Sequence, residues 1–219
     1  MRITLPSGTE AEIDTTVAGA TQGIVVAPDI FGLRPLFDDF VARMAREWQV
    51  KVIAVEPFPG RGFPLEIEPR VQAMPTMDDD LHLRDLEEGA AALEVNRVGL
   101  IGFCMGGMYC HKSSRSDRFS RIASFYGMIH VPKSWQGPKQ GDPIEILSRG
   151  HADRVLAVVG LKDPYTPTAD ITELKSIGVT VVEYQEAEHG FAHDAARPAH
   201  RPADAADAFA RAKEWLLGH

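Results

Sequence analysis

The sequence has few cysteines and no long apolar stretch. Its only two cysteines, Cys104 and Cys110, are six positions apart, a spacing that places them on different faces of a helix, so we expect them to stay unpaired. Without a C-x-x-C pair, structural zinc is not expected either. No apolar run approaches the length of a membrane-spanning helix, and residues 1–14 lack the apolar core of a signal peptide. We therefore expect a cytoplasmic protein with reduced cysteines and no membrane contact.

The sequence also lacks an excess of positive charge. It has 23 lysines and arginines against 31 aspartates and glutamates, a formal net charge of -8 and a pI of about 5.5. Proteins that bind nucleic acid or anionic membranes carry a basic surface, so neither partner is expected here. A small acidic substrate is not excluded, because a local arginine outweighs distant charges once salt screens them.

Apolar residues are present in the amount that one packed core needs. They make up 44% of the 219 residues, and no obvious linker, internal repeat or low-complexity tract divides the chain. We predict a single domain over residues 1–219, which acts as a monomer or a homodimer.

Short, continuously apolar segments alternate with longer amphipathic ones. The first kind is typical of strands buried on both faces, and the second of helices. The alternation predicts an α/β fold with a mostly parallel, doubly wound sheet and helices on both faces. The expected elements are an edge hairpin at 2–13, strands at 23–28, 51–55, 98–103, 122–127, 154–160 and 180–184, helices at 35–48, 78–93, 168–177 and 203–217, and a helical turn at 143–148. The proline-rich stretch 56–76 is expected to be a long loop with at most a short helix.

The central motif is GFCMG at residues 102–106, which ends the apolar run 98–103. It has the G-x-S-x-G pattern of a nucleophile elbow with cysteine in place of serine. Such an elbow holds the nucleophile on a strained turn between strand and helix, and the glycines let the two backbones approach closely. We predict Cys104 to be a nucleophile; the alternative is a buried structural thiol.

Two further strand ends carry an acid and a base. Asp163 follows the strand at 154–160, and His189 follows the strand at 180–184. Because sites in parallel sheets form beyond the carboxyl ends of the strands, Cys104, Asp163 and His189 are expected to meet. Nucleophile, acid and base in this order is the order of α/β-hydrolases. His189 would move the proton and Asp163 would fix its tautomer; the alternatives are a surface histidine and a helix cap.

A fourth polar group follows the strand at 23–28. Asp29 stands where this fold supplies an oxyanion-hole amide, and we predict the backbone amides of Ile30 and Met105 to form that hole. A carboxylate beside a thiol is unusual for simple acyl transfer. Asp29 therefore either has a specific role toward the thiol or only forms the turn and caps the next helix.

Four motifs in this order resemble the dienelactone hydrolase (carboxymethylenebutenolidase) family. They are DIFG at 29–32, GFCMGG at 102–107, DPY at 163–165 and HGF at 189–191. The resemblance covers nearly the whole chain and implies an α/β-hydrolase that needs no cofactor, with a Cys104–His189–Asp163 triad that opens an enol-lactone ring. The family's acidic residue before Ile-Phe-Gly is usually Glu and is thought to hold the resting thiol and take its proton. Asp29 matches that position with one methylene less.

The resemblance also indicates which residues contact the substrate. The best-studied members carry an arginine four residues after the histidine, which grips the substrate carboxylate, and here that position is His193. Arg70 corresponds loosely to a second family arginine. We expect His193 and Arg70 to reach the pocket, and Phe31, Tyr126 and Tyr165 to form its walls. The resemblance supports a cysteine hydrolase of small esters or lactones more firmly than it supports dienelactone as the substrate.

Other readings of the chain stay open. The protein could be a broad carboxylesterase or thioesterase, or a ligand-binding protein on this fold without catalysis. The acidic run 78–80 is read as a helix start and not as a metal site. Several residues are expected to be structural: Cys110 in the core, His111, Lys112 and Arg115 at the solvated end of the helix after the elbow, and Ala206, Phe209, Ala210, Trp215 and Leu216 on the inner face of the last helix.

Overall fold

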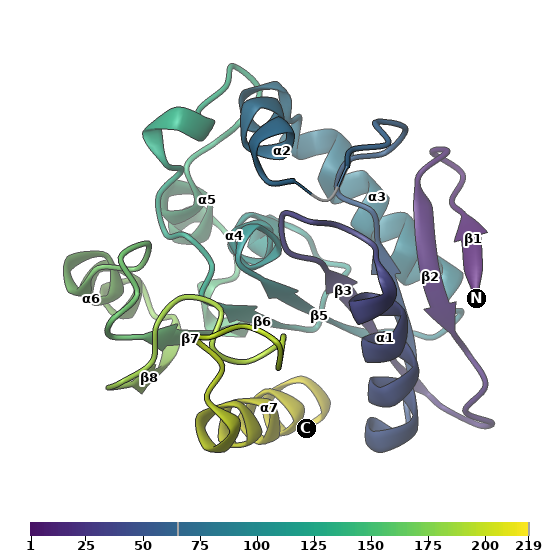
Figure 1. Cartoon of the computed structure of the whole chain (residues 1–219). Coiled ribbons are helices and arrows are strands. Elements are labelled where there is room, and N and C mark those ends of the chain that lie inside the picture. Colours follow the sequence, from purple (N-terminus) through teal and green to yellow (C-terminus); the bar gives the residue numbers. More distant parts are fainter. Residues whose placement is uncertain (65, 219) are drawn as a thin grey trace.

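Eight strands form one mixed sheet in the computed structural model, which describes residues 1–64 and 66–218 (Figure 1). The strands are β1 (Arg2–Thr4), β2 (Glu10–Asp14), β3 (Gln22–Ala27), β4 (Lys51–Val55), β5 (Arg97–Phe103), β6 (Arg121–Phe125), β7 (Val155–Gly160) and β8 (Thr180–Tyr184). Their order across the sheet is β1-β2-β4-β3-β5-β6-β7-β8. β2 pairs antiparallel with both of its neighbours, β1 and β4, and every other pair of neighbouring strands is parallel.

The topology places a crevice at the carboxyl ends of β3 and β5. From β3 the chain first moves to β4 on one side, and β5 then pairs with β3 on the other side. Such a reversal leaves a gap beyond the strand ends, where parallel sheets form their sites. Cys104 is the first residue after β5, and Asp29 is the second residue after β3.

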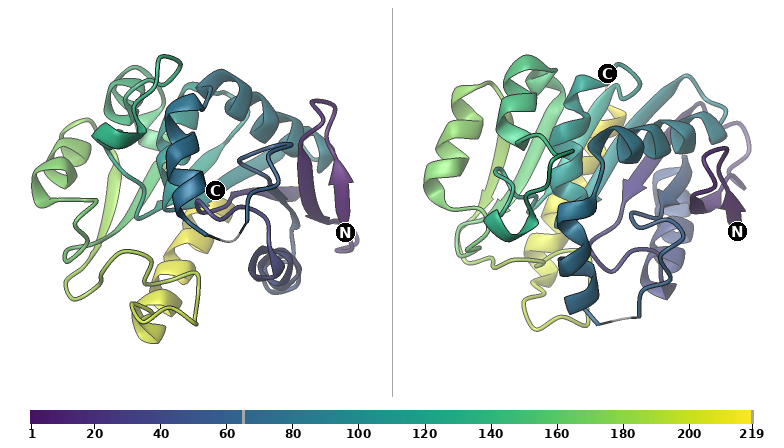
Figure 2. Two further views of the ribbon diagram at one scale, coloured as in Figure 1. Left: turned by 45° about the horizontal axis from the view of Figure 1, so that its top comes forward. Right: turned by 90° about the horizontal axis from the view of Figure 1, so that it is seen from above.

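Helices cover both faces of the sheet, as the right-hand view of Figure 2 shows. They are α1 (Pro35–Trp48), α2 (Glu68–Ala73), α3 (Asp79–Ala92), α4 (Met105–Lys112), α5 (Pro143–Arg149), α6 (Thr168–Ser176) and α7 (Pro202–Leu217). One apolar core lies between the sheet and α1 with α7, and a second lies between the sheet and α3, α5 and α6. The doubly wound α/β fold predicted from the sequence is confirmed, and α1 and β4 begin and end at the predicted residues; the single domain stays a prediction.

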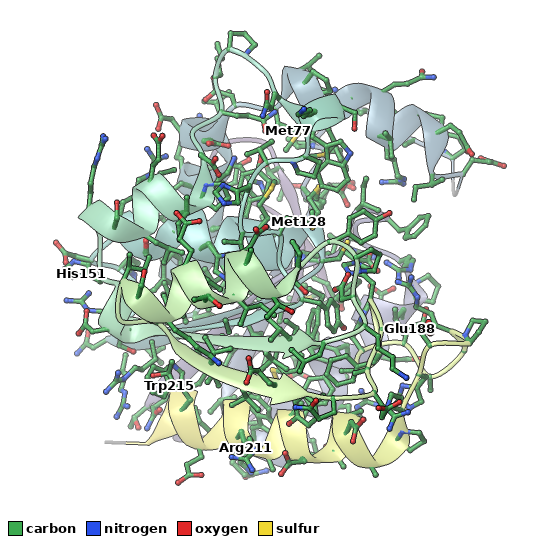
Figure 3. All side chains as sticks on the ribbon, turned by 90° about the vertical axis from the view of Figure 1, so that its left-hand side faces the viewer. Met77, Met128, His151, Glu188, Arg211 and Trp215 are labelled. Atoms are coloured by element: carbon green, nitrogen blue, oxygen red, sulfur yellow. The ribbon has the colours of Figure 1, made fainter. Side chains whose placement is uncertain are left out.

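Two of the residues predicted for the inner face of α7 were wrong. Ala206 and Ala210 are exposed, and the buried residues of α7 are Ala205, Ala208, Ala212 and Leu216. Alanines at this spacing let the helix lie close to the sheet, while the large Trp215 lies beside the contact and donates from its indole to the carbonyl oxygens of Ile122 and Arg154. Figure 3 shows Trp215 and Arg211 on α7, on the opposite side of the sheet from Met77 and Met128.

The end of α4 is also less exposed than expected. Arg115 is exposed, but His111 and Lys112 are 1% and 2% exposed. Asp79, at the start of α3, accepts two hydrogen bonds from the Lys112 ammonium at 2.9 and 3.0 Å, so the buried charge is paired. Asp78 caps α3 by accepting from the amides of Asp80 and Leu81, which confirms the predicted helix start.

No helix in the described part of the chain is both long and apolar enough to cross a bilayer.

Candidate active site

Cys104 lies on a strained turn between β5 and α4. Its φ of 55° and ψ of -115° lie in a region that side chains rarely occupy, at a cost of about 1–3 kcal/mol. A Cβ on Gly106 would overlap the carbonyl oxygens of Ala27 and Pro28, and one on Gly102 would overlap the Gly106 carbonyl. The Cys104 amide donates to the Phe125 carbonyl at 3.0 Å. The glycines and this bond fix the turn, so the thiol contributes nothing to its geometry.

His189 contacts both Cys104 and Asp163. Its Nδ1 lies 2.8 Å from Oδ2 of Asp163, and the ring lines the same pocket as Cys104, whose sulfur acts on the charge of the imidazole. The second oxygen of Asp163 accepts from the Tyr165 amide at 2.8 Å, which holds the carboxylate in place. The three side chains predicted from separate strand ends therefore lie together.

The charges around His189 favour its protonated form. Burial alone would lower the pKa of His189, but the Cys104 sulfur and the Asp163 carboxylate outweigh burial and raise that pKa to about 10. In the protonated form Nδ1 donates to Asp163, and the second ring nitrogen carries the other proton. An adjacent imidazolium is the usual means by which proteins favour a reactive thiolate.

The loop after β3 leaves one amide free. Of the amides at residues 30–33, Phe31 donates to the Asp29 side chain, Gly32 to the Asp29 carbonyl and Leu33 to Glu56. The Ile30 amide has no acceptor within the described residues. Met105 is the first residue of α4, where amides have no partner inside the helix. The two amides predicted for the oxyanion hole are thus unoccupied donors on either side of Cys104.

Asp29 is buried and saturated with donors. Arg34 binds it through two nitrogens at 2.7 and 2.9 Å, His193 Nε2 lies 2.8 Å from Oδ2, and the Phe31 amide donates at 3.0 Å. Burial by itself would raise the pKa of Asp29, but His193 and Arg34 outweigh it and hold that pKa well below its usual range. Asp29 is therefore a permanent carboxylate whose charge is already balanced.

The expectation that His193 and Arg70 reach the pocket is not met. His193 is enclosed, with its ring stacked on Phe103 at 4.9 Å and Nδ1 lying 2.6 Å from the hydroxyl of Tyr126. Arg70 is buried and donates to three backbone carbonyls, those of Ile30, Phe63 and Pro64. Both side chains are held by buried polar groups of the protein, which leaves neither free for a substrate.

The pocket beside Cys104 is small and largely apolar. It has a volume of about 180 Å³ and is lined by Asp29, Ile30, Phe31, Ile67, Cys104, Met128, Trp135, Tyr165, His189 and Arg197. Phe31 and Tyr165 are walls, as expected, and the Tyr165 ring lies edge-on to His189 at 4.9 Å. Tyr126 is not part of the lining; it is fully buried, and its ring packs against His189 from below the pocket surface. Among the described residues, no group of histidine, cysteine or carboxylate side chains is arranged to hold a metal ion.

Arg197 is the site residue that the sequence did not reveal. Its guanidinium lies against Gly190, where a Cβ would approach it to 2.7 Å, and it lines the pocket next to His189. Its side chain makes no hydrogen bond or ion pair within the described residues. The only signal in the sequence is an arginine eight residues after His189, in a short segment that ends before α7.

Comparisons with known proteins identify the family of the chain. The model of the dienelactone hydrolase family matches residues 11–219. A Bradyrhizobium protein named "Probable 2-oxo-3-(5-oxofuran-2-ylidene)propanoate lactonase" is 27% identical over 218 residues, covering 93% of this chain and 86% of its own. "Carboxymethylenebutenolidase 2" of Cupriavidus pinatubonensis is 26% identical over 133 residues, covering 59% of this chain and 53% of its own.

Solved structures share the fold. The crystal structure of a "Putative Dienelactone Hydrolase" from Klebsiella pneumoniae has a TM-score of 0.86 at 21% identity, and covers 100% of this chain and 98% of that one. The chain therefore belongs to the dienelactone hydrolase family and is an ester or lactone hydrolase.

Proposed function

We propose that the protein opens a small ester or lactone through a thioester on Cys104. The observation that supports this most strongly is the strained Cys104, which lines the same pocket as a histidine whose pKa is raised to about 10 by the sulfur and by Asp163. Strain of this kind persists where it serves function, which argues against the reading as a ligand-binding protein without catalysis. Cys104, His189 and Asp163 are the proposed nucleophile, proton carrier and orienting carboxylate.

The first half of the reaction forms the thioester. The Cys104 thiolate attacks the carbonyl carbon, and the oxyanion that results accepts hydrogen bonds from the free amides of Ile30 and Met105. When this intermediate collapses, the carbon–oxygen bond breaks and the leaving oxygen takes the proton from Nε2 of His189. In a lactone the leaving oxygen stays attached to the acyl chain.

The second half returns the enzyme to its starting state. Neutral His189 takes a proton from water, the oxygen of that water attacks the thioester, and the carbon–sulfur bond breaks to restore thiolate and imidazolium. One ester and one water give one acid and one alcohol, so the proposed reaction needs no cofactor and no metal. Nδ1 of His189 keeps its proton throughout and donates it in a hydrogen bond to Asp163.

The proposed substrate has an apolar body and a carboxylate. Phe31, Met128 and Trp135 would contact the body. Arg197, whose side chain has no hydrogen-bond or ion-pair partner among the described residues, would bind the carboxylate bidentately. A lactonase relative is named for 2-oxo-3-(5-oxofuran-2-ylidene)propanoate, an anion with an unsaturated five-membered lactone. We extend to this protein only the chemical class: a small unsaturated lactone with a nearby carboxylate.

A second candidate is a broad carboxylesterase or thioesterase for neutral substrates. Ile67 and Tyr165, at the pocket, are 42% and 54% exposed and are among the few large hydrophobic side chains left open to solvent. They would suit an apolar ester with no charge. The cytoplasmic location and the monomeric or dimeric state stay predictions.

The test is turnover of a panel of dienelactones and p-nitrophenyl esters by wild type and two cysteine variants. Cys104→Ala is expected to lose at least 1,000-fold in kcat, since the nucleophile of a triad accounts for an effect of about that size or more, and to stay folded. Cys110→Ala is the matched control, because Cys110 is buried outside the pocket, and it is expected to retain most activity. Turnover by folded Cys104→Ala above a few per cent of wild type would refute the proposal.

A further inference from the structure

One peptide group of the active-site loop is held from both of its sides. The Ile30–Phe31 peptide donates its N–H to Oδ1 of Asp29 at 3.0 Å and accepts at its carbonyl from Arg70 at 3.2 Å. This peptide directly follows the Ile30 amide. The peptide plane that follows Ile30 is therefore fixed, and the chain before Ile30 is anchored by β3. For this reason the Ile30 N–H has little freedom to change its direction.

Arg70 binds backbone carbonyls of two separate chain segments. Besides the Ile30 carbonyl it binds the carbonyls of Phe63 and Pro64, and its guanidinium lies over the rings of Phe58 and Phe63 at 5.8 and 5.5 Å. The planar fork of arginine can hold three carbonyls at once, which a shorter neutral side chain cannot do. Arg70 thus joins the segment before α2 to the loop after β3.

Asp29 has no acceptor position left for a thiol proton. A carboxylate offers about four lone-pair sites, and Asp29 fills them with Phe31, His193 and the two nitrogens of Arg34. To take a proton from Cys104 it would have to give up one of these buried bonds, which would leave a donor unpaired.

We propose that Asp29 and Arg70 are positioning residues that hold the Ile30–Phe31 peptide and so aim the Ile30 amide at the oxyanion of the substrate. This inference rests on the acyl-transfer mechanism proposed above. It replaces two roles drawn from the family resemblance, which are thiol handling for Asp29 and the binding of a substrate anion for Arg70. Neither residue contacts the reacting atoms; both act through the backbone.

The role of Arg70 is tested with Arg70→Gln and three reactions. Turnover of a neutral p-nitrophenyl ester and of an anionic lactone both require the oxyanion hole, whereas alkylation of Cys104 by iodoacetamide is a displacement without an oxyanion. Loss of one oxyanion donor costs about 100- to 1,000-fold in kcat, so a displaced donor is expected to cost about 10- to 100-fold for both substrates. KM and the alkylation rate are expected to change less than about three-fold.

Arg61→Gln is the matched control, because Arg61 is an exposed arginine of the same segment that also lies over the Phe63 ring. It is expected to leave all three rates near wild type. A loss in Arg70→Gln confined to the anionic lactone and seen in KM would show that Arg70 binds substrate, and no loss at all would show that it positions nothing. Either result overturns the inference.

Asp29 is tested with Asp29→Ala and Asp29→Asn. Asparagine keeps an acceptor for the Phe31 amide, so Asp29→Asn is expected to retain more kcat than Asp29→Ala, and both are expected to keep the wild-type pH profile of alkylation. A shifted pH profile would assign Asp29 to the thiol. If Asp29→Ala does not fold, the pH profile of Asp29→Asn decides alone.

Failure of the inference can be told apart from failure of the proposed function. If Cys104→Ala turns over, the acyl-transfer mechanism itself is wrong. If Cys104→Ala is inactive while Arg70→Gln keeps full kcat, the mechanism stands and only the positioning role is lost.

Discussion

Two histidines four residues apart occupy opposite environments. His189 keeps 13% of its side chain exposed and lines the pocket together with Cys104, while His193 is 0% exposed and contacts Asp29 and Tyr126. Each ring pairs with one carboxylate at 2.8 Å. Because both histidines pair with a carboxylate, that pairing does not show which of them is catalytic. The catalytic histidine is distinguished by its access to the pocket and by a reactive group near its second ring nitrogen.

The carboxylates of the two pairs differ in the same way. Asp163 is bound by His189 and a backbone amide, so its charge acts on the histidine. Asp29 is also bound by Arg34, which neutralises it. The Asp163 carboxylate thus acts on a histidine that lines the pocket. The Asp29 carboxylate is instead neutralised by its neighbours and holds the loop after β3 in place.

Substitutions of the two histidines are expected to differ most in their effect on kcat. His189→Ala should lower kcat by about 1,000-fold or more, as removal of a triad member does, while His193→Ala should lower it by less than about ten-fold. The double variant His189→Ala/Asp163→Ala should be only slightly worse than His189→Ala, because the two act as a unit. Steady-state kinetics on a neutral ester provides the measurement, and multiplicative losses would contradict the triad.

The next effect concerns substrate charge. If Arg197 binds the carboxylate, Arg197→Gln should lower kcat/KM for an anionic lactone by about 10- to 100-fold and leave its methyl ester nearly unchanged, as one buried charged contact is worth about 1.5–3 kcal/mol. In wild type the ratio of kcat/KM values for the two substrates should be constant between about pH 6 and 8, because guanidinium stays charged. A ratio that falls with the titration of a histidine would restore His193 as the binding group.

A third effect is expected in stability. His193→Ala removes a partner from the buried Asp29 and Tyr126, and should lower the free energy of unfolding by about 2–4 kcal/mol. Urea unfolding monitored by circular dichroism measures it, with His200→Ala as a control histidine that is less buried. A change below about 0.5 kcal/mol would show that the network around Asp29 contributes little to folding.

The pH dependence of this stability follows from Asp29. Because the pKa of Asp29 is lower in the folded protein than the unfolded value of about 3.9, its contribution is present above about pH 4 and is lost as the pH falls through the folded pKa. The stability gap between wild type and Asp29→Asn should thus be full at pH 6 and shrink below pH 4. Urea unfolding curves at several pH values measure this stability difference. A difference that grows as the pH falls would show that Asp29 is neutral in the folded protein.

The smallest expected effect is a shift in the pKa of His189. His189 should titrate near pH 10 in wild type, and its pKa should fall in Cys104→Ala, where burial acts with one fewer opposing charge. Nitrogen-15 chemical shifts of the imidazole report this directly. An unchanged pKa after loss of the sulfur would contradict the proposed ion pair.

The fold and the strand-end residues could be predicted because they depend on local patterns. Apolar segments predict β3 to β8. Cys104 directly follows β5, and Asp163 and His189 lie in the loops after β7 and β8, so the topology brings all three to the same edge of the sheet. The burial of Lys112 could not be predicted, since it depends on Asp79 from a distant helix. The contacts of Arg70, on α2, depend on backbone carbonyls of two irregular segments, and Arg197 lies in the irregular segment before α7. No periodicity in the sequence predicts how such segments fold.

The central claim is that hydrolysis passes through a thioester on Cys104. The most direct measurement is intact-protein and peptide mass spectrometry of enzyme quenched with acid during turnover of a slow p-nitrophenyl ester. We predict one acyl group per chain, located on the peptide that contains Cys104, absent in Cys104→Ala and longer-lived in His189→Ala than in wild type. Full turnover without any acyl group on Cys104, or with the acyl group on another residue, would contradict the account.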